Sequence, residues 1–278
     1  MDGTIGLKVH KEGVEEVIPI GTKHYRAFVG PMETYDVIGA MQFNLLTSLG
    51  LRDFHYLLDI GCGSLRAGRL FIVYLRPHHY YCIEPEKWLV EEGIKNNIGK
   101  ELIELKKPQF SYNKDFTCII FNQKFDFILA HSIFSHASQK QIIRCLSEVE
   151  KCMKETSIFS ATFVKGNSNY SGEKWVYPDT VTYTEQRMVE LANNAGLDFK
   201  TINWYHPNRQ TWALFTHPKN KMEITYLYDD ESLLRSTKKR LDDCEKRLAL
   251  LENRPHVILG RKILRTRFGR KIFQTLYS

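Results

Sequence analysis

The segment 57-LLDIGCGSLRAGRL-70 places two glycines directly after a short apolar run that ends in an acid. Residues 55–60 have the composition of a buried strand, and residues 64–75 have the pattern of a helix. The glycines therefore occupy a strand-to-helix turn, where open α/β sheets commonly bind a ligand. Glycine at 61 and 63 permits a tight turn and leaves no Cβ in the path of a flat ligand.

Two classes of ligand use such a turn, dinucleotides and S-adenosylmethionine. The dinucleotide motif needs glycine at its sixth position, so that helix and strand pack beside the pyrophosphate, but this chain has Arg66. The segment Leu-Leu-Asp-Ile-Gly-Cys-Gly resembles the first motif of the class I S-adenosylmethionine-dependent methyltransferases, and it departs from that motif at Leu65, where a third glycine is usual. The resemblance implies that Asp59, Gly61 and Gly63 bind S-adenosylmethionine. A tight turn without a ligand is the alternative.

A second apolar run, residues 80–83, ends at Glu84, 21 residues after Gly63. An acid about 20 residues beyond the glycines accepts hydrogen bonds from ribose hydroxyls, and both classes of ligand contain a ribose. We therefore predict that Glu84 binds the cofactor. A surface acid at the start of a helix over 86–98 is the alternative.

Strands and helices alternate between about residues 50 and 217, which predicts crossover connections and a parallel sheet covered by helices on both faces. The last two strands have no helix between them and should form an antiparallel hairpin through residues 206–209. The resemblance implies a seven-stranded Rossmann-like methyltransferase sheet with an antiparallel seventh strand, followed here by a C-terminal helical extension. The predicted strands are 55–60, 80–84, 109–113, 125–131, 157–164, 199–205 and 211–217, and the predicted helices are 64–75, 86–98, 138–154 and 184–195.

Two of the predicted helices begin with the spacing of a capping box. In such a box the first side chain accepts from the third helical N–H and the third side chain bonds back. The pairs are Ser138 with Gln141 and Thr182 with Glu185. Gly196 stands where the second of these helices should end.

The fourth predicted strand runs into two histidines, 125-FDFILAHSIFSHAS-138. Methyl transfer from a sulfonium chiefly requires that the acceptor be positioned, but a hydroxyl acceptor also benefits from a base, and histidine titrates near neutral pH. Class I small-molecule methyltransferases, which the chain resembles, often carry a histidine close to the acceptor at this point. We predict His136 as the base, His131 as the alternative, and Ala130 beside the cofactor. Histidines that only hold the loop are an equally open interpretation.

The segment Asn113-Lys114-Asp115-Phe116 follows the third predicted strand. Here the resemblance implies a polar or acidic residue against the adenine amine and an apolar residue against its ring. Asp115 and Phe116 are the candidates, and a solvent-facing loop acid is the alternative for Asp115.

Residues 21–46 form an aromatic-rich lead into a predicted helix. Val37, Met41 and Leu45 recur at a spacing of four, which places them on one helical face. The segment resembles the N-terminal cap helix that closes many small-molecule methyltransferases.

A long polar and aromatic insertion, residues 166–183, follows the fifth predicted strand. Loops of this length inside a compact domain are usually functional or disordered, and the two large aromatic residues of this one favour a packed lid. Together with the cap segment and the hairpin turn, the insertion predicts a wall for a polar, anionic or polyhydroxyl acceptor. The predicted substrate-binding residues are Tyr25, Arg26, Trp175, Tyr177, His206 and Arg209.

A leucine heptad follows residue 220 and predicts a short coiled coil within residues 219–254. We expect the chain to form a homo-oligomer through residues 227–251. A single amphipathic helix packed on its own domain is the alternative. The heptad residues are Leu227, Leu234, Leu241 and Leu248.

The C-terminal segment is basic. Residues 253–278 hold seven Lys or Arg and no acid, which equals the whole net charge of +7. Interleaved Ile, Leu and Phe make residues 256–278 a basic amphipathic segment suited to an anionic membrane surface. Nucleic acid fits less well as a partner, because residues 1–252 carry no basic excess.

The 278 residues, 43% of them hydrophobic, suffice for one domain of ordinary size with appendages. No secretory leader or membrane-spanning run is expected, and the six cysteines show neither a C-x-x-C pair nor metal-spaced histidines. We therefore expect a cytoplasmic protein without a metal site, peripheral at the inner face of the membrane where the tail binds. The expected divisions are a cap segment 1–50, a catalytic domain 51–218, a coiled-coil helix 219–254 and a basic tail 255–278.

The sequence thus predicts an S-adenosylmethionine-dependent methyltransferase acting on a hydroxyl or amine of a small polar acceptor. The form Gly-Cys-Gly-Ser-Leu-Arg-Ala-Gly, followed by Tyr-Tyr-Cys-Ile-Glu-Pro-Glu-Lys-Trp-Leu, resembles bacterial methyltransferases associated with cell-surface glycan assembly. This narrower resemblance implies a glycan or its precursor as acceptor. The other hypotheses are a methyltransferase-like scaffold that binds a partner through its C-terminal helix, and a nicotinamide-dependent oxidoreductase.

Overall fold

The computed structural model describes residues 18–220. The predicted coiled coil through residues 227–251 and the basic tail 256–278 lie outside these residues, as does the start of the predicted cap segment. Among the described helices none is long and apolar enough to cross a membrane.

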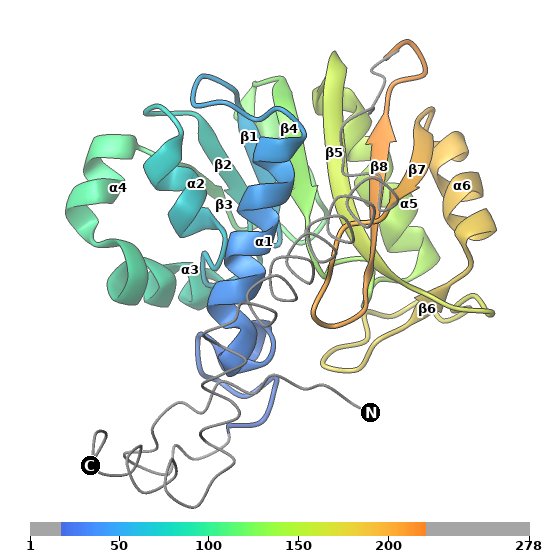
Figure 1. Ribbon diagram of the computed structural model, residues 1–278, viewed down its shortest axis with the longest axis horizontal. Helices are drawn as coiled ribbons and strands as arrows, with labels where there is room; N and C mark the ends of the chain where they lie inside the picture. Colours follow the sequence, from blue (N-terminus) through green and yellow to red (C-terminus); the bar gives the residue numbers. More distant parts are fainter. Residues whose placement is uncertain (1–17, 221–278) are drawn as a thin grey trace, which may run out of the picture. The chain divides into compact units, whose positions relative to one another are not determined.

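Seven strands form one sheet in the order β3-β2-β1-β4-β5-β8-β7, and the short β6 pairs with β5 (Figure 1). The first five strands pair in parallel, while β8 lies between β5 and β7 and is antiparallel to both. This confirms the predicted parallel sheet with an antiparallel hairpin at its end. The strands are β1 Leu57–Ile60, β2 Tyr80–Ile83, β3 Gln109–Ser111, β4 Phe125–Ala130, β5 Met153–Lys165, β6 Thr182–Tyr183, β7 Asp198–Ile202 and β8 Thr211–Thr216.

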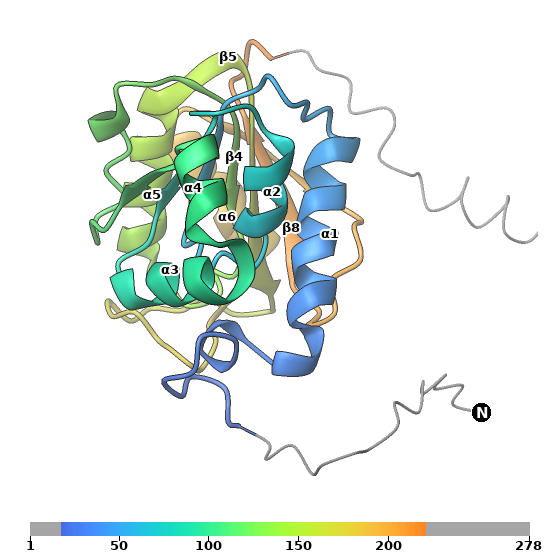
Figure 2. The same ribbon diagram turned by 90° about the vertical axis from the view of Figure 1, so that its left-hand side faces the viewer.

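Helices cover both faces of the sheet (Figures 1 and 2). Side chains of α1, α2 and α3 pack against one face, and side chains of α5 and α6 pack against the other. The central strands β1 and β2 are buried along their whole length, which explains why their sequences are continuous apolar runs. The α-helices are α1 Tyr35–Ser48, α2 Gly68–Tyr74, α3 Lys87–Gly93, α4 Lys100–Lys106, α5 Gln139–Cys152 and α6 Glu185–Asn194, and the short helical turns are η1 Ala27–Val29, η2 Met32–Thr34, η3 Ile94–Ile98 and η4 Ile119–Phe121.

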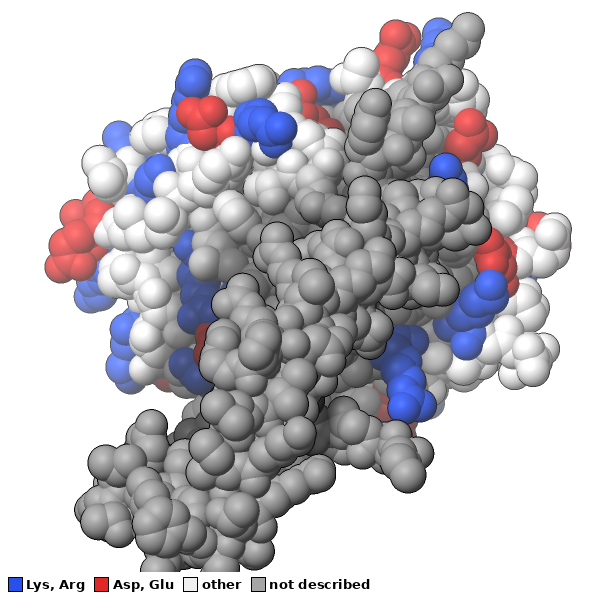
Figure 3. Space-filling view, viewed as in Figure 1, with Lys and Arg blue, Asp and Glu red and all other residues white. Residues whose placement is uncertain are grey.

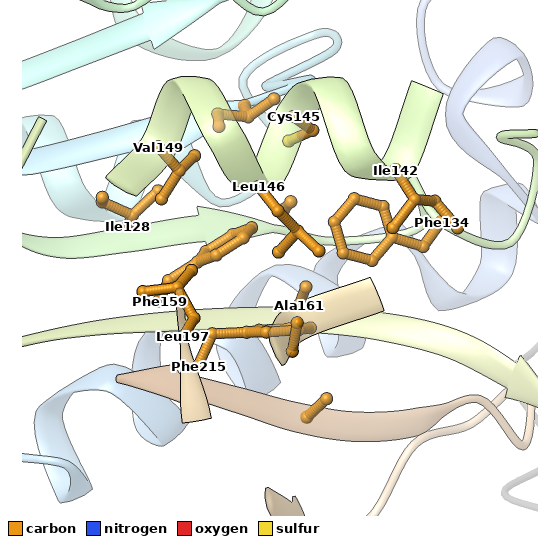
Figure 4. Close-up of a cluster of buried hydrophobic side chains, with 14 of the residues drawn as sticks. Ile128, Phe134, Ile142, Cys145, Leu146, Val149, Phe159, Ala161, Leu197 and Phe215 are labelled. Atoms are coloured by element: carbon orange, nitrogen blue, oxygen red, sulfur yellow. The ribbon is translucent and has the colours of Figure 1, made fainter. Parts of the chain in front are cut away.

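The core beneath α5 shows how the sequence pattern becomes packing. Ile142, Leu146 and Val149 recur every three or four residues, so they share the face of α5 that meets β4 and β5 (Figure 4). Phe159 of β5 pairs with Phe215 of β8, and their rings lie 5.2 Å apart. Burying each of these side chains contributes about 1.5–3 kcal/mol.

Several local expectations hold and others do not. The capping box of α5 is confirmed, because Ser138 accepts from the Gln141 N–H and the Gln141 side chain accepts from the Ser138 N–H. The second box is wrong: Thr182 belongs to β6, and the side chain of Thr184 caps α6 by accepting from the Arg187 N–H. Thr182 is in a strand because it pairs with Val164 of β5. This pairing between distant segments is not visible in the sequence, so the predicted N-cap lies two residues too early.

The predicted face of α1 is right at Met41 and Leu45 and wrong at Val37. Val37 is 55% exposed, whereas Ile38, Met41 and Leu45 are buried against the sheet. A helix has 3.6 residues per turn, so a strict spacing of four drifts off the buried face within three turns. The pattern therefore located the helix and most of its buried face, and Ile38 takes the place predicted for Val37.

The described surface carries charges of both signs. On the face shown in Figure 3, Lys and Arg side chains are interspersed with Asp and Glu side chains rather than gathered into one patch. Residues 18–220 contain 23 Lys or Arg and 20 Asp or Glu, so the two signs nearly balance in the part of the chain that the structure describes.

Candidate functional site

A cavity of about 810 Å³ opens at the carboxyl ends of β1, β2 and β4. Residues 20–31 of the cap segment and residues 164–180 of the insertion form its other walls. Its size suits a ligand as large as a nucleoside with a side chain. The predicted site residues that line it are Asp59, Gly61, Gly63, Glu84, Phe116, His131, His136, Trp175 and Tyr177.

The turn after β1 requires its two glycines. Gly61 has φ +73°, and a Cβ there would lie 2.1 Å from the Ile133 Cδ1 atom. Gly63 has φ +56°, and a Cβ there would lie 2.6 Å from a methyl carbon of Val29. Leu65, the position where the resembled motif has a third glycine, also has a positive φ of 59°. The backbone at Leu65 therefore adopts a conformation that glycine would accommodate without strain.

Glu84 holds this turn from the next strand. Its Oε2 accepts from the Gly63 N–H at 2.8 Å, and its Oε1 accepts from the Glu86 N–H at 2.9 Å. Burial raises the pKa of Glu84, and the two N–H donors oppose that rise. The side chain is only 7% exposed and lines the cavity, so the alternative of a surface acid is wrong. Each oxygen retains a lone pair that can accept from a ligand hydroxyl.

Asp59 is the third residue of β1, and it lines the cavity. Its Oδ2 accepts from the Tyr80 hydroxyl at 2.7 Å. The pKa of Asp59 is raised to about 7: burial is the main cause and the charge of Glu84 adds to it, while the Tyr80 hydrogen bond and the charge of Arg66 oppose it. This carboxyl group is therefore near its midpoint at neutral pH.

His136 is oriented by the insertion. Its Nδ1 lies 3.0 Å from the Val176 carbonyl oxygen and 2.7 Å from the Asp179 carbonyl oxygen, so Nδ1 carries the proton and donates to both. Burial lowers the pKa of His136, while the two carbonyls raise it, so the ring is neutral at pH 7. Nε2 is then a lone pair without a partner among the described residues, on a ring that lines the cavity.

The insertion and the cap segment meet over the cavity. The Tyr177 hydroxyl donates to the Phe28 carbonyl, and the two rings lie 5.3 Å apart. Phe28 in turn contacts Trp88 edge-on at 5.2 Å. Trp175 contacts the ring of His136 at 5.5 Å. These contacts confirm that the insertion packs as a lid.

Arg66 is the main cavity residue that the sequence analysis did not assign to a site. It is 7% exposed, and its Nη2 lies 3.0 Å from His131 Nδ1. His131 Nε2 lies 2.8 Å from His206 Nε2, so the three side chains form a chain from the cavity to the β7–β8 turn. The signal for Arg66 in the sequence is its place in the glycine motif, where an arginine argues against a dinucleotide and also places a positive charge beside the ligand.

Two predicted cofactor residues do not reach the cavity. Asp115 accepts from the Thr117 N–H and pairs with Arg144 at 3.6 Å on the surface, so the solvent-facing alternative holds for it. Ala130 is fully buried within β4. The neighbours Asn113 and Phe116 line the cavity on this side.

Four predicted substrate-binding residues also lie off the cavity wall. Arg26 donates to the Tyr25 hydroxyl at 3.0 Å and lies over the Tyr35 ring at 4.9 Å, so this pair packs within the cap segment. His206 reaches the cavity only through His131. Arg209 sits in the hairpin turn with φ +56°, and its neighbours Asn208 and Gln210 face the cavity in its place.

Residues 18–220 contain no group of three or more His, Cys, Asp or Glu side chains that could hold a metal ion. Five cysteines in this range are free and buried, and one of them, Cys62, lines the cavity beside the glycines. Burial raises the pKa of the Cys62 thiol well above its usual value, so it remains protonated at neutral pH.

Comparison with known proteins places the fold. No family model matches the chain. An uncharacterised protein of Methanocaldococcus jannaschii is 28% identical over 155 residues, which cover 52% of this chain and 40% of that protein. The match therefore spans less than half of the relative's length.

Among solved structures, an S-adenosylmethionine-dependent methyltransferase of Leishmania major superposes with a TM-score of 0.53 at 14% identity, over 69% of this chain and 76% of that one. The mitomycin 7-O-methyltransferase superposes with a TM-score of 0.50 at 14% identity, over 69% and 56% of the two chains. These likenesses show the fold: residues 18–220 have the architecture of the class I S-adenosylmethionine-dependent methyltransferases.

Proposed function

We propose that this protein is an S-adenosylmethionine-dependent methyltransferase that methylates a hydroxyl group of a small polar acceptor. The observation that carries the proposal is the Glu84 carboxylate, which bridges the Gly63 and Glu86 N–H groups at the base of the cavity. This arrangement joins the glycine turn to the end of β2, and it leaves carboxylate lone pairs for a ribose.

The residues present fit S-adenosylmethionine. Gly61 and Gly63 line the cavity, and without a Cβ each lets Ile133 or Val29 pack directly against the turn. Glu84 would hold the ribose hydroxyls, and Phe116 would contact the adenine ring beside Asn113. The S-adenosylmethionine-dependent methyltransferase of Leishmania major, which shares the fold, supports this choice of cofactor.

His136 supplies the base that a hydroxyl acceptor needs. Its Nδ1 proton is held by two backbone carbonyls, so Nε2 can accept a proton from an acceptor in the cavity. The chemistry that S-adenosylmethionine supplies when bound is an electrophilic methyl group on a sulfonium. The lid residues Trp175 and Tyr177 exclude water around His136 and position the acceptor.

The acceptor class follows from the walls of the cavity. They combine aromatic faces with amide side chains, among them Gln42, Gln141 and Gln210, which suits a polyhydroxyl molecule. The resemblance to methyltransferases of cell-surface glycan assembly makes a glycan or its precursor the acceptor to test first. The amine acceptor is less favoured, because a neutral amine needs no base to become nucleophilic.

Two rival functions make different predictions. A nicotinamide-dependent oxidoreductase would bind a pyrophosphate at this turn. Arg66 stands at the sixth position of the dinucleotide motif, where that motif needs its last glycine. A scaffold would bind the cofactor but release no methylated product. We expect calorimetry to show binding of S-adenosylhomocysteine and none of NAD, and an assay with labelled S-adenosylmethionine to show transfer to sugar hydroxyls. Binding of NAD alone would refute the proposal, and cofactor binding without any transfer would favour the scaffold.

A further inference from the structure

Arg66 is a buried cation with no acid in contact. It is 7% exposed, and no carboxylate forms an ion pair with it in the part of the chain that the structure describes. Its Nη1 donates to the Val29 carbonyl at 2.7 Å, and its Nε has no hydrogen-bond partner. Its Nη2 lies 3.0 Å from His131 Nδ1. Asp59 acts on this charge electrostatically but forms no ion pair or hydrogen bond with it. A buried guanidinium that lacks a paired acceptor is costly, so this arrangement calls for a partner outside residues 18–220.

The protons on His206 can be assigned from its contacts. Its Nδ1 accepts from the Asn208 N–H at 3.1 Å and from the Gln210 N–H at 3.4 Å. Burial, together with the charge of Arg66, lowers the pKa of His206 to about 4, so the ring is neutral at pH 7 and carries its one proton on Nε2. That proton points to His131 Nε2 at 2.8 Å.

The position of the ring proton on His131 follows from that of His206. Burial and the adjacent Arg66 charge lower its pKa well below the usual range, so it also carries one proton at pH 7. Because its Nε2 accepts from His206, its proton must lie on Nδ1. Nδ1–H then faces the Nη2–H of Arg66 at 3.0 Å, and two donors meet with no acceptor between them.

A negatively charged acceptor would pair with the buried Arg66 guanidinium, and it would also accept from the two N–H donors that face each other. We propose that Arg66 and His131 bind a carboxylate group of a ligand in the cavity, and that His206 is a positioning residue that fixes the proton of His131 on Nδ1. The carboxylate accepts from Arg66 Nη2–H and His131 Nδ1–H. All four ring nitrogens then have a partner of the right kind.

A carboxylate fits this place better than a phosphate. One negative charge balances the one guanidinium, and a planar carboxylate matches the guanidinium edge formed by Nε–H, which has no partner, and Nη2–H, which faces the His131 ring. The carboxylate belongs either to the amino-acid part of S-adenosylmethionine or to the acceptor. The first of these two sources rests on the proposed function, which the inference deepens.

The experiment measures the affinity of the full chain for S-adenosylhomocysteine and for 5′-methylthioadenosine, which lacks the amino-acid part. Arg66→Met removes the charge while filling the space, and Arg69→Met is the matched control. Arg69 lies three residues further on, in α2, where it donates to Asp36 and does not line the cavity. If the carboxylate is that of the cofactor, Arg66→Met weakens S-adenosylhomocysteine at least about tenfold and changes 5′-methylthioadenosine less than about twofold. Arg69→Met should change neither.

Acetate distinguishes the second source. If the carboxylate belongs to the acceptor, Arg66→Met leaves S-adenosylhomocysteine affinity unchanged. Acetate added to the S-adenosylhomocysteine complex then shifts the His131 ring nitrogen signals of wild type and Arg69→Met in NMR, but not those of Arg66→Met. Equal S-adenosylhomocysteine affinity in wild type and Arg66→Met, with no acetate response specific to wild type, overturns the proposal.

The histidine tautomers provide a second test, and its first measurement uses wild type alone. In the wild-type complex that holds the carboxylate, nitrogen NMR should show His131 protonated on Nδ1 and His206 on Nε2. His206→Phe should leave His131 free to exchange tautomers and weaken carboxylate binding, and His206→Gln, whose amide can donate to His131, should restore both. A His131 ring protonated on Nε2 in every complex overturns the proposal. Failure of wild type to bind S-adenosylhomocysteine refutes the proposed function instead. The carboxylate site is then decided by acetate added to the free protein, which should shift the His131 signals of wild type and Arg69→Met but not those of Arg66→Met.

Discussion

Replacing Glu84 by Ala tests the cofactor assignment most directly, because this carboxylate is both a structural and a ligand-binding group. Its two oxygens accept from the Gly63 and Glu86 N–H groups. The lost hydrogen bonds to a ribose should cost about 1.5–3 kcal/mol when one partner is charged, which weakens cofactor binding by roughly 10- to 150-fold.

The same substitution should also reduce the stability of the fold. Each buried N–H left without an acceptor costs about 1–3 kcal/mol. Water in the adjoining cavity can reach the vacated space, so we expect a loss near the lower end for each group. Glu84→Gln keeps an acceptor for one N–H and should lose less stability while still losing the charge. Urea unfolding of both variants measures this difference.

A chemical double-mutant cycle separates ribose binding from distortion of the turn. Affinities for S-adenosylhomocysteine and its 2′-deoxy analogue are measured calorimetrically with wild type, Glu84→Ala and Glu91→Ala, whose carboxylate lies exposed on α3 and pairs with Lys87. Wild type and Glu91→Ala should bind the 2′-deoxy ligand more weakly, and Glu84→Ala should no longer distinguish the two ligands. If Glu84→Ala discriminates between them as strongly as wild type does, Glu84 does not bind the ribose.

Four further predictions follow from the site and the tail. Gly61→Val should abolish S-adenosylhomocysteine binding in calorimetry, since a Cβ there would lie 2.1 Å from Ile133 Cδ1; retained affinity would contradict the role of the turn. His136→Ala should slow methyl transfer roughly 10²- to 10⁴-fold with cofactor affinity unchanged, and a loss below about threefold at saturating acceptor would leave it a loop-holding role. Asp59 has a folded pKa raised to about 7, above its unfolded value, so its neutral form stabilises the fold and that contribution is lost as pH rises from about 4 to 7. Urea unfolding should show wild type losing up to about 4 kcal/mol relative to Asp59→Asn over this range, and parallel pH profiles would refute the shift. A chain ending at Asn220 should be monomeric in sedimentation and should not bind anionic vesicles at low salt, whereas full-length protein should self-associate and bind them; an oligomeric truncated chain would argue against the predicted coiled coil.

The fold could be predicted because its signals are local. The apolar runs before Gly61 and Glu84 are buried on both faces, and burial on both faces is what makes a strand uniformly apolar. The antiparallel hairpin was visible because no helix fits between its strands. The short helix α4 and the strand β6 were missed, since each depends on neighbours distant in the sequence more than on its own pattern.

The site could be predicted only where the backbone fixes it. Glycines at positive φ and an acid at a strand end carry their positions in the sequence. Side chains on the cap and the hairpin do not: Arg26 and Arg209 looked suitable for an acceptor wall, but cation–aromatic packing holds one in the cap and turn geometry directs the other away from the cavity. Composition shows that such residues are present, not where they face.

Arg66 stands in the glycine turn, whose position the sequence shows, but the direction of its side chain depends on segments distant in the sequence. Long charged side chains are rarely buried, so nothing in the sequence marks an arginine in a turn as a cavity residue. Its burial arises from the cap segment, whose Val29 carbonyl accepts from Nη1, and from His131 after β4. The bulk that excludes a pyrophosphate therefore brings a positive charge into the cavity, and the hydrogen bonds of His206 fix which proton of His131 faces it. A site built this way favours a ligand with a single carboxylate over one with a phosphate, and it makes the choice of ligand depend on three residues that lie 65 and 75 positions apart in the chain.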